Sequence, residues 1–112
     1  MKWISLLTKE QLDDLVQRSY TTSCLILKHS TTCSISYMAK SRLERDWRFE
    51  EGDMIPYYLD LQSHRDLSRE IAERFEVYHE SPQVLLIKGG VCVYDASHLD
   101  ISFAELVECS VG

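Results

Sequence analysis

The stretch LILKHSTTCSIS, from Leu25 to Ser36, joins an apolar run to a polar turn and then to the beginning of a helical pattern. A nearly continuous apolar run, which here already begins at Cys24, is typical of a central strand covered on both faces. Polar residues 30–32 predict a turn, and Cys33 stands where a helix could begin. The stretch therefore predicts a strand, a loop and a helix, with a cysteine at the junction.

Outward from this stretch, helical and strand periodicity alternate along the chain. The pattern predicts a short apolar segment over 3–7, helices over 8–19, 34–49, 63–75 and 102–109, a strand over 54–62, and two strands within 83–97 joined by a turn at Gly89-Gly90. The order β-α-β-α-β-α-β-β-α implies parallel strands with helical crossovers, then a hairpin and a closing helix. It resembles a thioredoxin-like fold, a three-layer α/β/α sandwich with a central mixed sheet.

Local patterns refine the predicted helices. Three pairs have the spacing of a capping box, in which a hydroxyl binds the backbone three residues later: Thr8 with Gln11, Ser63 with Asp66, and Ser102 with Glu105. In the helix over 34–49, the apolar stripe is predicted to contain Ile35, Met38, Ala39, Leu43 and Trp47.

Composition limits the class of protein. The 112 residues suffice for one domain, 1–112, and 45% of them are hydrophobic. The formal net charge of −6 argues against partners such as nucleic acid or an anionic membrane. The short apolar run at the start lacks the features of a signal peptide, and no run reaches the length of a membrane span. We therefore expect a cytoplasmic protein with reduced cysteines.

Cys33 is the candidate reactive residue. Unpaired backbone N–H groups at a helix N-terminus carry partial positive charge, so a thiolate there is stabilised relative to a thiol. The alternative is a buried structural cysteine, since free cysteine is among the most buried residue types. The polar neighbours of Cys33, residues 30–32 and Ser34, favour the reactive interpretation.

The remaining cysteines and the histidines give weaker signals. Cys24 and Cys92 fall in predicted strands and Cys109 near the end of the last helix, so packing roles are expected for all three. The cysteine spacings lack the close pairs typical of a zinc site, and we expect no metal. His29 and His79 could supply positive charge near a thiolate, although satisfied or solvent-facing histidines are the simpler interpretation.

Four segments, KHSTTCSIS, SHRDLSREIAERF, VYHESPQVLLIKGG and YDASHLDIS, together resemble the YtxJ family, the monothiol bacilliredoxin-like group of the bacillithiol system. The resemblance implies that Cys33 is the nucleophile, because a T-C-P-I-S-type segment of the family matches Thr32, Cys33, Ile35 and Ser36. Ser34 replaces the usual proline, which leaves the helix start looser and puts rate and substrate choice in question. The thioredoxin-like order of elements implies that Ser81-Pro82 is a cis bond facing the cysteine, as the matching proline is in thioredoxin-like proteins, with neighbouring backbone groups aligning the substrate.

The resemblance implies a thiol–disulfide exchange enzyme that removes a low-molecular-weight thiol from S-thiolated client proteins. Ser36 stands in place of a resolving cysteine, so a dithiol cycle cannot close within the site. The Ser36 hydroxyl is expected to hydrogen-bond the sulfur, and Thr32 is a further hydroxyl contact. We expect no bound cofactor, a bacillithiol-type thiol as co-substrate, a thiol or redoxin as reductant, and a monomer or weak dimer. The alternatives are a redox sensor or adaptor without turnover and, with less support, a cluster-binding monothiol glutaredoxin.

Overall fold

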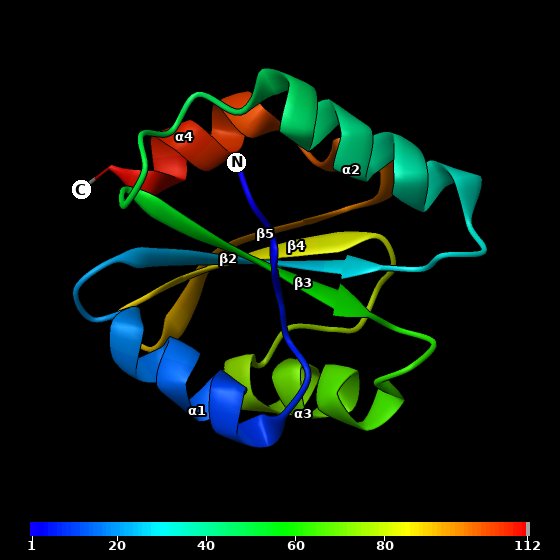
Figure 1. Cartoon of the computed structure of the whole chain (residues 1–112), viewed down its shortest axis with the longest axis horizontal. Coiled ribbons are helices and arrows are strands. Elements are labelled where there is room, and N and C mark those ends of the chain that lie inside the picture. The colour runs from blue at the N-terminus through cyan, green and yellow to red at the C-terminus, as the bar shows by residue number, and fades with distance from the viewer. Residues whose placement is uncertain (112) are drawn as a thin grey trace.

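A computed structural model describes residues 1–111 of the chain, and its elements follow the predicted order (Figure 1). The strands are β1 (Ile4–Ser5), β2 (Ser23–His29), β3 (Met54–Asp60), β4 (Gln83–Lys88) and β5 (Val91–Ser97). The helices are α1 (Lys9–Arg18), α2 (Ser34–Asp46), α3 (Arg65–Phe75) and α4 (Phe103–Ser110), with a short 3₁₀ turn, η1 (His98–Asp100), before α4. The last three residues of the predicted helix over 34–49 lie outside α2.

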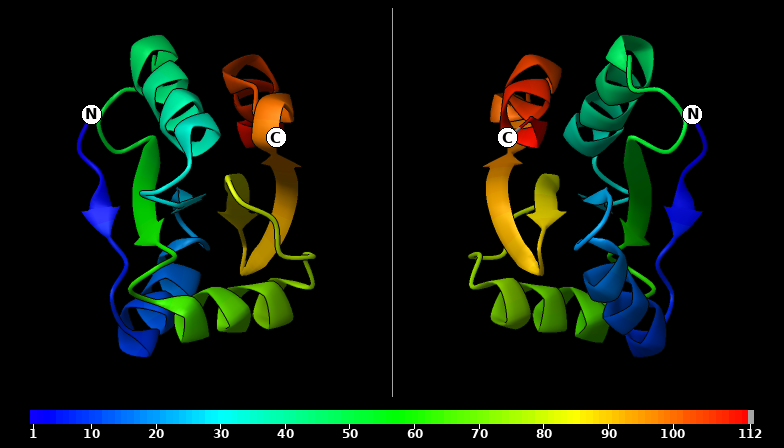
Figure 2. Two further views of the ribbon diagram at one scale, coloured as in Figure 1. Left: turned by 90° about the vertical axis from the view of Figure 1, so that its right-hand side faces the viewer. Right: turned by 90° about the vertical axis from the view of Figure 1, so that its left-hand side faces the viewer.

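The five strands form one sheet in the order β1-β3-β2-β4-β5. β1, β3 and β2 run parallel, whereas β4 is antiparallel to both β2 and β5. Helices α2 and α4 cover one face of the sheet, and α1 and α3 cover the other (Figures 1 and 2). The predicted three-layer sandwich with a central mixed sheet is confirmed.

Each face of the sheet carries its own apolar core. Cys24 and Ile26 of β2 pack with residues of α1 and α3, whereas Leu25 and Leu27 pack with residues of α2 and α4. Alternate side chains of a strand point to opposite faces, so a strand buried on both faces reads as one apolar run. Of the helices described in residues 1–111, none combines the length and hydropathy that a membrane crossing requires.

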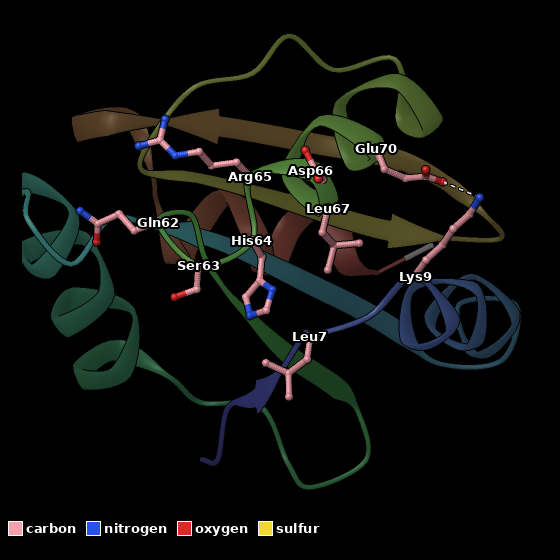
Figure 3. Close-up of a pocket in the computed structure, with 9 residues that line it drawn as sticks. All are labelled: Leu7, Lys9, Gln62, Ser63, His64, Arg65, Asp66, Leu67 and Glu70. Carbon is pink, nitrogen blue, oxygen red and sulfur yellow. Dashed lines mark ion pairs between the residues drawn. The ribbon is translucent and has the colours of Figure 1, made fainter.

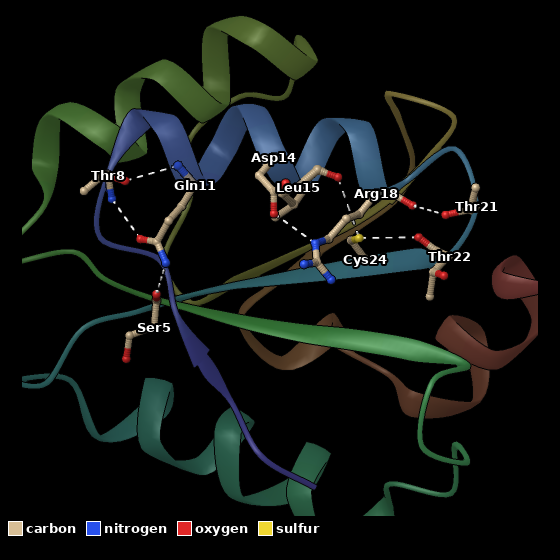
Figure 4. Close-up of polar contacts among 9 residues, drawn as sticks. All are labelled: Ser5, Thr8, Gln11, Asp14, Leu15, Arg18, Thr21, Thr22 and Cys24. Carbon is tan, nitrogen blue, oxygen red and sulfur yellow. Dashed lines mark hydrogen bonds and ion pairs between the residues drawn. The ribbon is translucent and has the colours of Figure 1, made fainter.

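Two of the three predicted caps are present. Thr8 and Gln11 form a reciprocal capping box at the start of α1 (Figure 4), and Ser102 accepts a hydrogen bond from the Glu105 N–H at the start of α4. The prediction for α3 is wrong, because His64 occupies the N-cap and makes no side-chain capping bond. The Ser63 hydroxyl instead donates to Asp60, which ties the loop to the end of β3.

The buried face of α2 also differs from the prediction. Ala39 and Leu43 are buried as expected, but Ile35 and Met38 are 42% and 52% exposed. Ser36 is fully buried in their place. The first turn of α2 therefore presents a hydroxyl, rather than the apolar stripe, to the end of the sheet.

The Gly89-Gly90 hairpin turn is confirmed. Both glycines have positive φ angles, 60° and 80°, which suit a two-residue connection between β4 and β5. A Cβ at Gly90 would lie 2.6 Å from the hydroxyl oxygen of Tyr20, so the Tyr20 side chain would have to shift, and the positive φ angle itself disfavours any other residue.

Candidate functional site

Cys33 lies at the junction of the loop after β2 and helix α2, where it is the N-cap residue. Its backbone is extended, with φ −113° and ψ 119°, and its sulfur makes no capping hydrogen bond. The Cys33 N–H donates to the Ser30 carbonyl at 3.2 Å, which closes the loop into a turn. The residue is partly exposed. A sulfur in this position is accessible and faces the positive end of the α2 dipole.

Gln62, in the loop after β3, connects this turn to a neighbouring loop. Its amide nitrogen donates to the Thr32 hydroxyl at 2.8 Å, and its amide oxygen accepts from the Thr31 hydroxyl. The Gln62 backbone is itself held by Asp60 at 3.1 Å. Thr32 is exposed, and its hydroxyl oxygen is already engaged in hydrogen bonds that join the two loops.

Ser36 is bonded to groups other than the sulfur. Its hydroxyl lies 2.6 Å from Nδ1 of His29 and accepts from the Ser30 N–H at 3.0 Å. Within residues 1–111, Cys33 and Ser36 share no side-chain hydrogen bond, so the expected contact with the sulfur is absent from this structure. Ser36 instead ties the first turn of α2 to the end of β2. Ser34, the first residue of α2, is exposed.

The surroundings of His29 disfavour its charged form. It is 1% exposed, and its ring lies against Tyr37 with the two centroids 4.6 Å apart. Burial, followed by the nearby Lys40 charge, lowers the pKa of His29 below its ordinary value. Burial likewise lowers the pKa of His79, with Lys28 as the second cause. Neither imidazole therefore supplies the positive charge that their positions in the sequence suggested.

The Ser81-Pro82 peptide bond is cis, as expected. Pro82 is buried directly before β4, and its carbonyl accepts from the His98 N–H at 2.9 Å. Because Lys28 of β2 pairs with Gln83 of β4, the segment before β4 and the loop that leads to Cys33 lie at the same end of the sheet (Figure 1). The hydroxyl oxygen of Ser81 is buried and has no partner within residues 1–111.

The other cysteines are placed for packing. Cys24 is fully buried, and its thiol contacts the carbonyl oxygens of Leu15 and Thr22 (Figure 4). Burial raises the pKa of both Cys24 and Cys92 to about 11, so neither forms a thiolate readily. Cys109 packs against the core under α2 and α4, and all four cysteines are free.

One buried charge was missed in the sequence. Lys28 interrupts the apolar run of β2, yet its side chain is fully buried on the α3 side of the sheet. Its Nζ donates to the Ser68 carbonyl at 3.3 Å and lies 3.3 Å from Nδ1 of His79. Burial lowers the pKa of Lys28 to about 8. The sequence did offer a signal for this buried charge, because a lysine within the apolar run of a central strand has no solvent-facing side to occupy.

A cavity of about 470 Å³ lies between the loop before Cys33, helix α3 and the segment before β4. Its lining brings together two predicted site residues, Thr32 and Ser81, and adds the unpredicted Arg65 and Arg69 of α3. Among residues 1–111, no group of three or more histidine, cysteine or acidic side chains is arranged to hold a metal ion.

Comparison with known proteins places this geometry in a family. Residues 4–106 match the family of the monothiol bacilliredoxin BrxC. A solved protein with a thioredoxin fold is 34% identical, with a TM-score of 0.80 over 96% of this chain and 93% of that one.

More distant structures share the fold alone. Thioredoxin from Malassezia sympodialis (Mala s 13) is 15% identical, with a TM-score of 0.79 over 98% of this chain and 92% of its own. Thioredoxin f from spinach chloroplast, in its short form, is 15% identical, with a TM-score of 0.69 over 97% and 90% of the two chains. The match over residues 4–106, together with the 34% identical structure, shows that the chain belongs to the monothiol bacilliredoxin BrxC family of thioredoxin-like oxidoreductases.

Proposed function

We propose that this chain removes a low-molecular-weight thiol of the bacillithiol type from mixed disulfides on client proteins, with Cys33 as the nucleophile. The observation that carries the proposal is the partly exposed sulfur at the start of α2, one turn before a serine rather than a second cysteine. The other sulfurs are held in the cores or have thiols that resist ionisation. A cysteine with no second cysteine one turn further along the helix can exchange disulfides but cannot close an internal one within the site.

The exchange proceeds in two balanced steps. The Cys33 thiolate attacks the small-thiol sulfur of the mixed disulfide, forms a new S–S bond to it, and releases the client as a thiolate. A second small thiolate, or the thiolate of a partner redoxin, then attacks the adduct and releases Cys33. The oxidised product is a disulfide between the two small thiols or between the small thiol and the redoxin. Each step forms one S–S bond and breaks one.

The surrounding residues have positioning roles in this scheme. Ser36 holds the first turn of α2 against β2 through His29 and Ser30, which keeps Cys33 in place at the N-terminus of the helix. The backbone around Ser81 and Pro82 would align the incoming disulfide from across the site. The buried position of Pro82 and the bond from His98 to its carbonyl keep that segment in place.

The test uses a client protein that carries one small thiol as a mixed disulfide. The chain is added at substoichiometric amount with an excess of the free thiol, and release is followed by intact mass. We expect many turnovers per chain for the wild type and none above the uncatalysed rate for Cys33→Ser. Cys109→Ser is the matched control, because Cys109 is another partly exposed sulfur but lies on α4. It should retain the wild-type rate.

One outcome separates the enzyme from the sensor alternative. A single stable adduct on Cys33 without turnover, in the presence of excess thiol, would refute catalysis and support a redox sensor. Unchanged activity in Cys33→Ser would refute the assignment of the nucleophile altogether.

A further inference from the structure

The cavity beside the Cys33 loop differs in charge from the rest of the molecule. The whole chain has a formal net charge of −6, yet no acidic residue lines this cavity. Arg65 and Arg69 of α3 lie on one wall, and His79 and Ser81 on another. The buried amino group of Lys28 lies behind His79, 3.3 Å from its Nδ1. The local field is therefore opposite in sign to the net charge.

Three acidic residues that neighbour the lining residues in the sequence already have partners. Asp66 pairs with Arg69 at 3.6 Å, and Glu80 pairs with His98 at 3.1 Å. Asp60 accepts from the Gln62 N–H and the Ser63 hydroxyl, both at 3.1 Å. The side chain of Arg65 has no ion-pair or hydrogen-bond partner within residues 1–111. Its guanidinium is thus available, with a planar set of donors that suits a carboxylate.

The adjacent hollow, of about 510 Å³, provides a contrast (Figure 3). It shares Arg65 and Gln62 with the cavity beside Cys33, but Asp66 and Glu70 also line it. Glu70 pairs there with Lys9 at 3.7 Å, and Figure 3 shows the Arg65 side chain extending away from Glu70. Its charges cancel one another, so it has no basis for selecting an anion.

Residues on either side of the proposed reaction site line the same cavity. Ser81 lines it and directly precedes the cis proline, although its hydroxyl oxygen is buried and has no partner in the described chain. Ser30 and Thr32 of the Cys33 loop line it as well. A small group attached to the Cys33 sulfur would therefore be within reach of this lining.

We propose that this cavity is the subsite for the small-thiol half of the mixed disulfide, that it selects thiols bearing carboxylates, and that Arg65 is the residue that contacts the carboxylate. The Lys28 charge adds to the field, whereas the charge of Arg69 is already paired with Asp66. The proposal rests on the proposed function in that the ligand reaches the cavity through Cys33. It assigns specificity to α3, which lies on the opposite side of the sheet from the helix that begins after Cys33.

The experiment measures stoichiometric attack of Cys33 on three symmetrical disulfides of similar size: 3,3′-dithiodipropionate, 2-hydroxyethyl disulfide and cystamine. Cys33 forms a bond to one sulfur, and the other half leaves as a thiolate. Intact mass gives each rate, which is divided by the rate of 2-mercaptoethanol with the same reagent. This removes the different intrinsic reactivities of the three reagents. Net charge alone predicts that the cationic cystamine reacts fastest with this acidic protein.

We expect the reverse order, with the normalised rate for the acidic reagent about tenfold above that for cystamine at low ionic strength. Arg65→Gln should reduce this ratio about fivefold, and added salt should reduce it in the wild type. Arg42→Gln is the matched control, because it removes the same charge from an exposed position on α2 outside the cavity. It should leave the ratio unchanged.

Equal normalised rates for the three reagents, or equal effects of Arg65→Gln and Arg42→Gln, would overturn the subsite. Failure of Cys33 to react with any reagent would overturn both the subsite and the proposed function. Because this measurement needs no turnover, the two proposals can fail separately. A chain that shows the acid preference but does not turn over on S-thiolated clients would keep the subsite and lose the catalytic function.

Discussion

Replacement of Lys28 by methionine should reveal the cost of burying an amino group in the central strand. The side chain is fully buried, and burial lowers its pKa from 10.5 to about 8. Methionine has a similar volume and carries no charge, so Lys28→Met removes this titration with little change in packing. The quantity to compare is the free energy of unfolding of the two chains as a function of pH.

The direction in which stability changes with pH follows from how many protons the folded and unfolded chains bind. Between pH 8 and pH 10.5 the unfolded chain holds more protons on Lys28 than the folded chain does, so this group makes stability rise with pH. Below pH 8 both states are protonated, and the folded state bears the full cost, about 3 kcal/mol at pH 7 for a shift from 10.5 to about 8. From pH 7 to pH 10 the wild type should gain about 2.5 kcal/mol relative to Lys28→Met.

Urea unfolding at pH 7, 8, 9 and 10, followed by tryptophan fluorescence under reducing conditions, measures this difference. Tyrosines and cysteines also ionise in this range, but they do so in both chains and cancel in the comparison. Lys9→Met replaces a solvent-exposed lysine of α1 and is the control. Its free energy of unfolding should change with pH in parallel with that of the wild type. Parallel curves for Lys28→Met and wild type would refute the reasoning, since they would mean that Lys28 keeps its ordinary pKa in the fold.

Three other substitutions test local features by the same unfolding assay. Ser36→Ala should lower the free energy of unfolding by about 1–3 kcal/mol, because it leaves the His29 ring and the Ser30 N–H without their partner. An unchanged free energy of unfolding would mean that water replaces the hydroxyl. Thr8→Ala should cost about 1 kcal/mol through loss of the α1 cap, and Thr8→Ser should restore most of it. Gly90→Ala should lower the free energy of unfolding by about 1 kcal/mol, because φ is 80° and the Tyr20 side chain would have to shift; an unchanged midpoint would contradict this turn geometry.

The sequence by itself determined the order of elements, the caps of α1 and α4, and the place of Cys33 between a strand and a helix. These features depend on side chains a few residues apart, such as Thr8 and Gln11, or on a periodicity within one element. The cis bond before Pro82 was also expected, but from resemblance to a family rather than from local physics.

Tertiary structure alone decided what surrounds the sulfur. Ser36 is buried and Ile35 is exposed because the first turn of α2 lies over the end of β2, where His29 accepts a polar neighbour. Lys28 finds its carbonyl partner on Ser68, 40 residues away. Arg65 and Arg69 of α3 line one cavity together with Ser30 and Thr32 of the Cys33 loop, because long-range packing joins residues that no periodicity relates.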